Sequence, residues 1–137
     1  MNVREMEELA QFLETVPRKR FNMKFWAATF KRFAGYDENV KICLRDTEAC
    51  GTACCVAGYQ IVRKDNRCVK SGAAFDKKGS KIGLVEDLAA RELGLDYRQK
   101  RDLFFAENWP LNKNGKPFHE TPKGAAKRIR HMIETGE

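Results

Sequence analysis

The sequence predicts a mainly α fold: a compact bundle of five or six helices around one buried central helix, with room for a short β-hairpin. The expected single helical domain spans residues 1–137, a length that suits one domain with a core of its own. Residues 50–59 form the densest run of small and apolar residues in a chain that is one-third charged. Segments with helical periodicity lie on both sides of that run.

The central helix is expected over residues 51–62. Its apolar residues point in every direction around the helix axis, and a helix that is apolar all round has to be buried on all sides. Gly58 lies inside this segment, where glycine costs roughly 1 kcal/mol of helix propensity relative to alanine. The close approach of another backbone would explain a glycine at this position.

Two helices and a short strand are expected before the central helix. Residues 3–16 carry apolar side chains at helical spacing with glutamates on the other side, and Pro17 ends the helix. Residues 21–33 place their aromatic residues on one broad face, which predicts a second helix that packs by that face. The apolar residues of 40–44 alternate, which is typical of a strand.

The segment after the central helix is expected to be irregular and basic. Residues 63–81 hold seven basic and two acidic side chains. A small hairpin is expected around Cys68 and Val69. Loops of this length are often functional.

Three helices are expected in the C-terminal part. The first covers residues 84–93, with Gly94 as its left-handed cap. Asp96 begins the next helix, with Gln99 three residues later in a capping-box arrangement. Thr121 caps the last helix, and a proline occupies its first position.

The charge of the chain is unevenly distributed. Of the net charge of +7, residues 1–16 carry −3, so the remainder carries +10. Such an excess favours an anionic partner, and nucleic acid first. No apolar run reaches the roughly 20 residues of a membrane span, and the N-terminus lacks the apolar core of a signal peptide. We therefore expect a cytoplasmic protein without membrane contact, whose five cysteines are reduced thiols.

Two clusters of cations are the candidate nucleic-acid contacts. The first lies at the junction of two expected helices, where three consecutive cations are not expected to be buried. The second begins the second helix of a segment, residues 87–101, that resembles a helix-turn-helix. The members of the two clusters are Arg18, Lys19, Arg20, Arg98, Lys100 and Arg101. Lys100 departs from the helix-turn-helix pattern, because it stands where an apolar residue is usual.

The alternative function is that of a thiol-dependent enzyme. Cys50 is expected at the N-terminal end of the central helix, where the helix dipole and free amides favour a thiolate. Such an enzyme also needs a base, and the candidate is His119, in a loop before the last helix. The opposite interpretation is that the cysteines pack a tight core. Their spacing is not that of the common zinc modules, so we expect no metal and no cofactor.

Residues 50–59, Cys-Gly-Thr-Ala-Cys-Cys-Val-Ala-Gly-Tyr, resemble the signature of a scattered group of small phage and bacterial proteins of unknown function. That group has Cys-Gly-Thr, two variable residues, Cys, and a small apolar run that ends in glycine and an aromatic residue or histidine. Members often carry a histidine just before the first cysteine, where this chain has Ala49. The resemblance implies a shared fold and brings no established activity with it.

Together these observations predict a small basic intracellular binding or regulatory module. The phage-like resemblance implies an accessory role, in which the protein would engage nucleic acid, a nucleoprotein partner or another host macromolecule. An enzyme centred on Cys50 remains the alternative.

Overall fold

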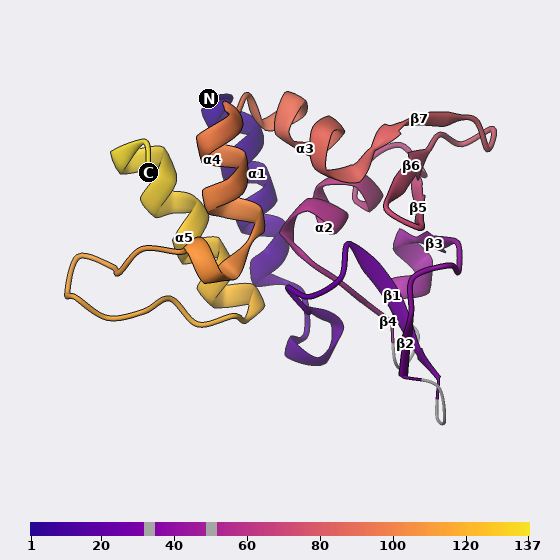
Figure 1. Ribbon diagram of the computed structural model, residues 1–137, viewed down its shortest axis with the longest axis horizontal. Helices are drawn as coiled ribbons and strands as arrows, with labels where there is room; N and C mark the ends of the chain where they lie inside the picture. Colours follow the sequence, from indigo (N-terminus) through magenta and orange to yellow (C-terminus); the bar gives the residue numbers. More distant parts are fainter. Residues whose placement is uncertain (32–34, 49–51) are drawn as a thin grey trace.

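The computed structural model describes residues 1–31, 35–48 and 52–137, which form α-helices and two antiparallel sheets (Figure 1). The α-helices of these residues are α1 (Val3–Glu14), α2 (Val56–Val62), α3 (Val85–Leu93), α4 (Tyr97–Phe104) and α5 (Pro122–Thr135). Short 3-10 helices are η1 (Arg18–Arg20), η2 (Leu44–Glu48) and η3 (Ala106–Asn108).

The strands form one three-stranded and one four-stranded sheet. The first has the order β2 (Gly35–Asp37), β1 (Ala27–Lys31), β4 (Thr52–Cys54). The second has the order β3 (Ile42–Cys43), β5 (Cys68–Lys70), β6 (Ala73–Phe75), β7 (Lys81–Leu84). The protein therefore belongs to a mixed α and β class, and the prediction of a mainly α bundle is wrong.

The helices and the sheets occupy opposite ends of the longest axis of the molecule. Helices α1, α4 and α5 lie at one end, the strands lie at the other, and α2 and α3 lie between them (Figure 1). Side chains from all five of these helices contribute to the buried core, among them Leu9, Leu13, Tyr59, Ile61, Leu93, Leu103, Phe104, Ile129 and Met132.

The helix signals in the sequence are confirmed at most of the expected termini. Gly94 follows α3 in the left-handed conformation, with a φ of 66°. Asp96 and Gln99 form the expected capping box of α4. The Thr121 hydroxyl accepts a hydrogen bond from the backbone of Gly124 at 3.0 Å at the start of α5. The short strand within 40–44 and the hairpin around Cys68 are confirmed as well, as β3 and as the β5–β6 pair.

The expected helix over residues 21–33 is wrong, because part of this segment forms strand β1. β1 pairs with β4 on one side and with β2 on the other, so its backbone groups are satisfied by sheet hydrogen bonds. Aromatic and β-branched residues are also favoured in strands. Phe30 of β1 is exposed, whereas Trp26 packs edge-to-face against Phe105 with ring centroids 5.8 Å apart.

The central helix is shorter than expected, but its burial is confirmed. α2 begins at Val56, because Thr52–Cys54 pairs with β1 as strand β4. All residues of α2 are buried. A β-carbon at Gly58 would overlap the carbonyl oxygen of Trp26, so the close backbone approach that the glycine predicted is present.

Two of the cysteines form a disulfide, which corrects the expectation that all are reduced thiols. Cys43 and Cys68 face each other in the register of β3 and β5, and their sulfur atoms are bonded. Cys54 and Cys55 are free and buried. Cys50, which was expected at a helix terminus, lies outside the described residues. The cap of α2 is Cys55, whose Sγ accepts a hydrogen bond from the Gly58 amide at 3.4 Å.

Candidate nucleic-acid interface

Many cations near the helices are paired within the molecule. Arg130 of α5 donates to Glu7 and Glu14 of α1, at 2.9 and 2.6 Å. Lys100 of α4 lies 3.3 Å from Glu86 of α3. Every carboxylate in an ion pair between described residues lies on α1, α3, α4 or α5. These pairs compensate part of the positive charge of the helical end.

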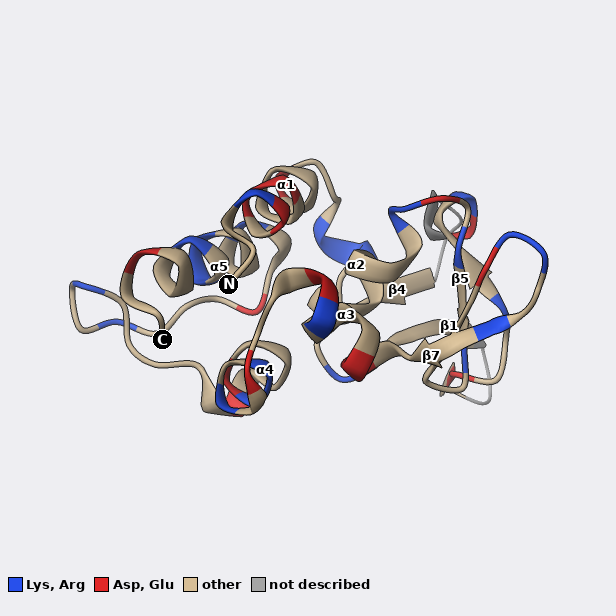
Figure 2. Ribbon diagram, turned by 90° about the horizontal axis from the view of Figure 1, so that it is seen from above, with Lys and Arg blue, Asp and Glu red and all other residues tan. Residues whose placement is uncertain are grey.

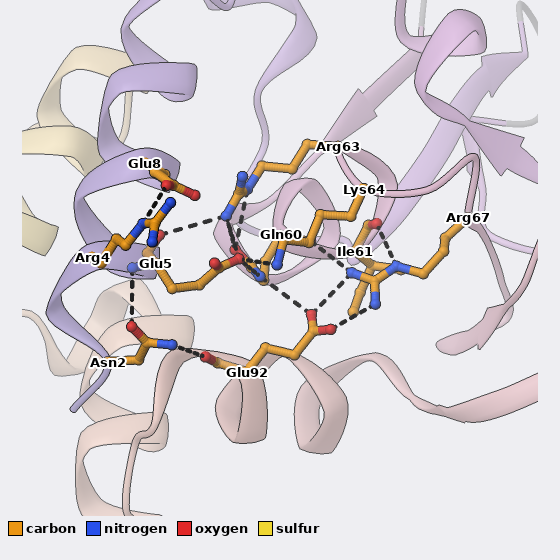
Figure 3. A network of polar contacts seen from close by, with 10 residues as sticks. All are labelled: Asn2, Arg4, Glu5, Glu8, Gln60, Ile61, Arg63, Lys64, Arg67 and Glu92. Carbon is orange, nitrogen blue, oxygen red and sulfur yellow. Dashed lines mark hydrogen bonds and ion pairs between the residues drawn. The ribbon is translucent and has the colours of Figure 1, made fainter.

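The most buried of these contacts form a cluster where α1, α2 and α3 meet (Figure 3). Gln60 is fully buried and donates to both Glu5 and Glu92, at 2.9 and 3.2 Å. Arg63 donates to Glu5 at 2.6 Å, and Arg67 donates to Glu92 at 2.7 Å. We refer to these five residues as the junction cluster.

The junction cluster changes the acidity of its two glutamates. Burial acts to raise the pKa of Glu92, but the hydrogen bonds and charge of Arg67 outweigh it, so the pKa is lowered. Burial acts in the same way on Glu5, and hydrogen bonds from Lys64 and Gln60 together with the charge of Arg63 lower its pKa. Because each cation here has a carboxylate partner, the cluster holds three helices together and offers no open charge to an external anion.

The four-stranded sheet and its loops carry cations of a different kind. Blue segments lie along this end of the molecule in Figure 2, over β5, the loop between β6 and β7, and β7. The exposed cations are Lys41, Arg45, Lys70, Lys77, Lys78 and Lys81. None of them has an ion-pair partner in the described ranges of the chain. We call these six residues the cationic sheet surface.

The register of the strands sets two of these cations on one face, and a third, Lys81 of β7, lies across a register shift from β6. Ile42 and Val69 are register partners and are both buried. Because side chains alternate along a strand, the neighbouring Lys41 and Lys70 both point to the opposite, outer face, and the continued register sets them side by side. Lys81 is the partner of Phe75, which is in turn the partner of Cys68. Like charges that face each other across two strands are destabilising.

The nearby carboxylates hold turns and do not pair with these cations. Asp76 accepts hydrogen bonds from the backbone of Lys78 and Ser80, each at 2.9 Å. Asp46 accepts one from the backbone of Cys43 at 2.8 Å. A hollow of about 260 Å³ beside the disulfide is lined by Lys41, Arg45 and Lys77, together with Asp76. The positive charge of this surface is therefore open to an external anion.

The first predicted cluster lies in η1. Arg18 and Lys19 are exposed there. Arg20 is half-buried, and its Nε is buried without a hydrogen-bond partner among the described residues. The backbone carbonyl of Arg20 accepts a hydrogen bond from the Tyr59 hydroxyl. Two of the three predicted contacts are thus accessible.

The second predicted cluster lies on α4. Arg98 and Arg101 are exposed, and Arg98 lies 3.7 Å from Asp102. The side chain of Lys100 is only 15% exposed and pairs with two carboxylates of α3. This pairing explains how a lysine replaces the apolar residue usual in a helix-turn-helix, and it leaves Lys100 little charge for an external phosphate.

The free thiols among the described residues are poor nucleophiles, and the enzymatic alternative is centred on Cys50, which lies outside the described residues. Burial raises the pKa of Cys54 well above that of an ordinary thiol, and it raises the pKa of Cys55 to about 12. Neither is a thiolate at neutral pH. His119 is exposed in the loop before α5. Among residues 1–31, 35–48 and 52–137, no group of three or more histidine, cysteine or acidic side chains could hold a metal ion.

Comparisons with protein-family models, with curated proteins and with solved structures gave no match. The resemblance to the small phage and bacterial proteins therefore stays a prediction. In the described part of the chain, no helix is both long enough and apolar enough to cross a bilayer.

The cationic sheet surface was only partly visible in the sequence. The excess of positive charge in residues 63–81 indicated four of its members. Lys41 and Arg45 belong to a different segment, and they join the surface because β3 pairs with β5. A β pairing across some 25 residues is set by tertiary structure and leaves no local pattern.

Proposed function

We propose that this protein binds nucleic acid by contacting phosphates with its cationic sheet surface. The observation that carries the proposal is the set of six exposed cations on one surface without ion-pair partners among the described residues, whereas helix cations such as Lys100 and Arg130 are paired with carboxylates. The resemblance to phage and bacterial proteins supports an accessory role for such a module.

The chemistry of the surface favours the phosphate backbone over the bases. Lysine ammonium groups are flexible point charges that bind phosphate without fixed geometry. Reading bases in the major groove needs an element that enters it, such as a helix or a two-stranded ribbon with suitable side chains. The surface consists of lysines and one arginine around short strands, so we propose binding to duplexes with little dependence on sequence.

Binding to a fluorescently labelled duplex tests this proposal. In the sheet variant, Lys41→Gln/Lys70→Gln/Lys81→Gln, three phosphate contacts are lost, and the affinity at low salt should fall by about 10-fold or more. The control variant, Lys24→Gln/Arg91→Gln/Lys123→Gln, loses the same charge at exposed positions outside the cationic sheet surface, and it should bind nearly as the wild type does. Absence of binding by the wild type, or equal weakening in both variants, would overturn the proposal.

The clusters predicted from the sequence are tested with the same assay. Arg18→Ala/Lys19→Ala/Arg20→Ala and Arg98→Ala/Lys100→Ala/Arg101→Ala should weaken binding if the duplex also extends over η1 or α4. We expect the second variant to lose less than its three charges imply, because Lys100 is already paired with Glu86 and Asp87.

A further inference from the structure

A second basic region lies at the opposite end of the molecule from the sheet surface, between α5 and the loop that precedes it (Figure 1). It is a hollow of about 440 Å³, within the range of small-molecule sites. Its lining includes Lys116, Phe118 and His119 of the loop and Lys127 and His131 of α5. We call it the C-terminal hollow.

The loop side of the hollow is held in place by its own hydrogen bonds. The Asn112 side-chain oxygen accepts hydrogen bonds from the backbone amides of Asn114 and Lys116, at 2.9 and 3.0 Å. The backbone amide of Asn112 donates to the Lys116 carbonyl at 2.7 Å. The His119 carbonyl packs so closely on Gly124 that a β-carbon there would overlap it. The hollow is therefore formed before any ligand arrives, which lowers the entropic cost of binding.

The lining is positively charged even after its internal ion pairs are considered. Lys113 pairs with Glu134, the single lining carboxylate, at 2.5 Å, and Arg130 pairs with carboxylates of α1. Lys116 and Lys127 are exposed and have no ion-pair partner in the described ranges. Two imidazoles add hydrogen-bond donors to these two open charges.

Phe118 gives the hollow an aromatic wall. Its ring meets the His131 ring edge-on, with centroids 5.3 Å apart, and the guanidinium of Arg128 lies 6.0 Å from its centroid. Arg128 is fully buried, and its Nε and Nη1 have no hydrogen-bond partner among the described residues. Burial lowers the pKa of Arg128 to about 10, although the charge of Asp102 acts to raise it. A buried, incompletely bonded cation therefore touches the same ring that lines the hollow.

We propose that the C-terminal hollow binds a mononucleotide, that is, a phosphate ester that carries a planar base. The phosphate would contact Lys116 and Lys127, and the base would stack on Phe118 or His131. An inorganic anion would use the lysines and leave the aromatic wall without a role. The C-terminal hollow is separate from the cationic sheet surface, so the mononucleotide proposal and the duplex-binding proposal can each be disproved without affecting the other.

Calorimetric titration with adenosine monophosphate, adenosine and inorganic phosphate tests the proposal. The monophosphate should bind the wild type more tightly than either fragment. Lys116→Gln/Lys127→Gln should weaken its binding by about 10-fold or more, since two charge-assisted contacts to the phosphate are lost. The sheet variant Lys41→Gln/Lys70→Gln/Lys81→Gln should bind it unchanged.

The aromatic wall is tested separately. Phe118→Leu should weaken binding of the monophosphate and leave that of inorganic phosphate unchanged, whereas Phe118→Tyr keeps the ring and should retain both. Circular dichroism confirms that each variant is folded. The proposal is overturned if the wild type does not bind the monophosphate, if inorganic phosphate binds equally well, or if the lysine variant binds as the wild type does.

Discussion

The helices and the four-stranded sheet differ in how their cations are compensated. Arg130, Lys100 and Arg67 each have carboxylate partners on α1 or α3, within 2.6 to 3.4 Å. Lys41 and Lys70 lie next to the register partners Ile42 and Val69 of the sheet. The nearby Asp46 and Asp76 accept hydrogen bonds from backbone amides. A net charge of +7 therefore describes the molecule poorly, because the open charge is concentrated on particular surfaces.

The two regions are also held together by different interactions. The helical end depends on buried apolar side chains and on the ion pairs of the junction cluster. The four-stranded sheet contains short strands, and the Cys43–Cys68 disulfide links two of them covalently. Each region should therefore respond to a different perturbation.

The largest effect is expected from removing a buried member of the junction cluster. Arg67→Ala leaves Glu92 without its main partner and should lower the free energy of unfolding by about 3 kcal/mol. Arg98→Ala is the matched control, since the Arg98 side chain is 80% exposed, and it should lose less than about 1 kcal/mol. Urea denaturation measures both, and equal losses would show that the cluster is no more important than a surface pair.

Reduction of the disulfide should have a somewhat smaller effect. The bond closes a loop with a sequence separation of 25 residues. Loop-closure entropy sets an upper limit of about 3.5 kcal/mol for such a crosslink, and crosslinks often contribute less than this limit. Cys43→Ala/Cys68→Ala should thus unfold at a lower urea concentration than the oxidised wild type and match the reduced wild type. An unchanged midpoint after reduction would mean that strand pairing alone holds this sheet.

Acid should weaken the junction cluster. The pKa values of Glu5 and Glu92 are lowered on folding, so their contribution is fully present above the unfolded-state value and is lost as the pH falls through the folded-state value. Stability should be constant near neutral pH and decrease below about pH 4.5. Urea midpoints from pH 7 to pH 3 measure this, and Glu5→Gln/Glu92→Gln should show a shallower decrease than the wild type.

The smallest effect is expected on the sheet itself. Lys70→Glu places a carboxylate beside Lys41 and should raise the free energy of unfolding by about 0.5 kcal/mol, because opposite charges across two strands attract. Lys41→Glu should give the same gain, and the double variant should lose it again. If both single variants are destabilised, the two side chains are not neighbours on the outer face.

The sequence was informative where local chemistry determines structure. The capping box of Asp96 and Gln99, the left-handed Gly94 and the packing at Gly58 depend on residues close together or on sterics at one position. The strand β1 was missed because its aromatic residues also fit a helical stripe, and pairing with β2 and β4 decided between the two. The cationic sheet surface and the disulfide both depend on the β3–β5 pair, which joins distant segments.

The salt dependence of duplex binding tests the central claim most directly. Each phosphate contact contributes about 0.9 to the slope of log affinity against log salt concentration on duplex DNA. Lys41→Gln/Lys70→Gln/Lys81→Gln should therefore reduce the slope by about 2.7, while the control Lys24→Gln/Arg91→Gln/Lys123→Gln should leave it close to that of the wild type. The same slope for the wild type and the sheet variant would contradict the claim that open charge on the four-stranded sheet binds phosphates.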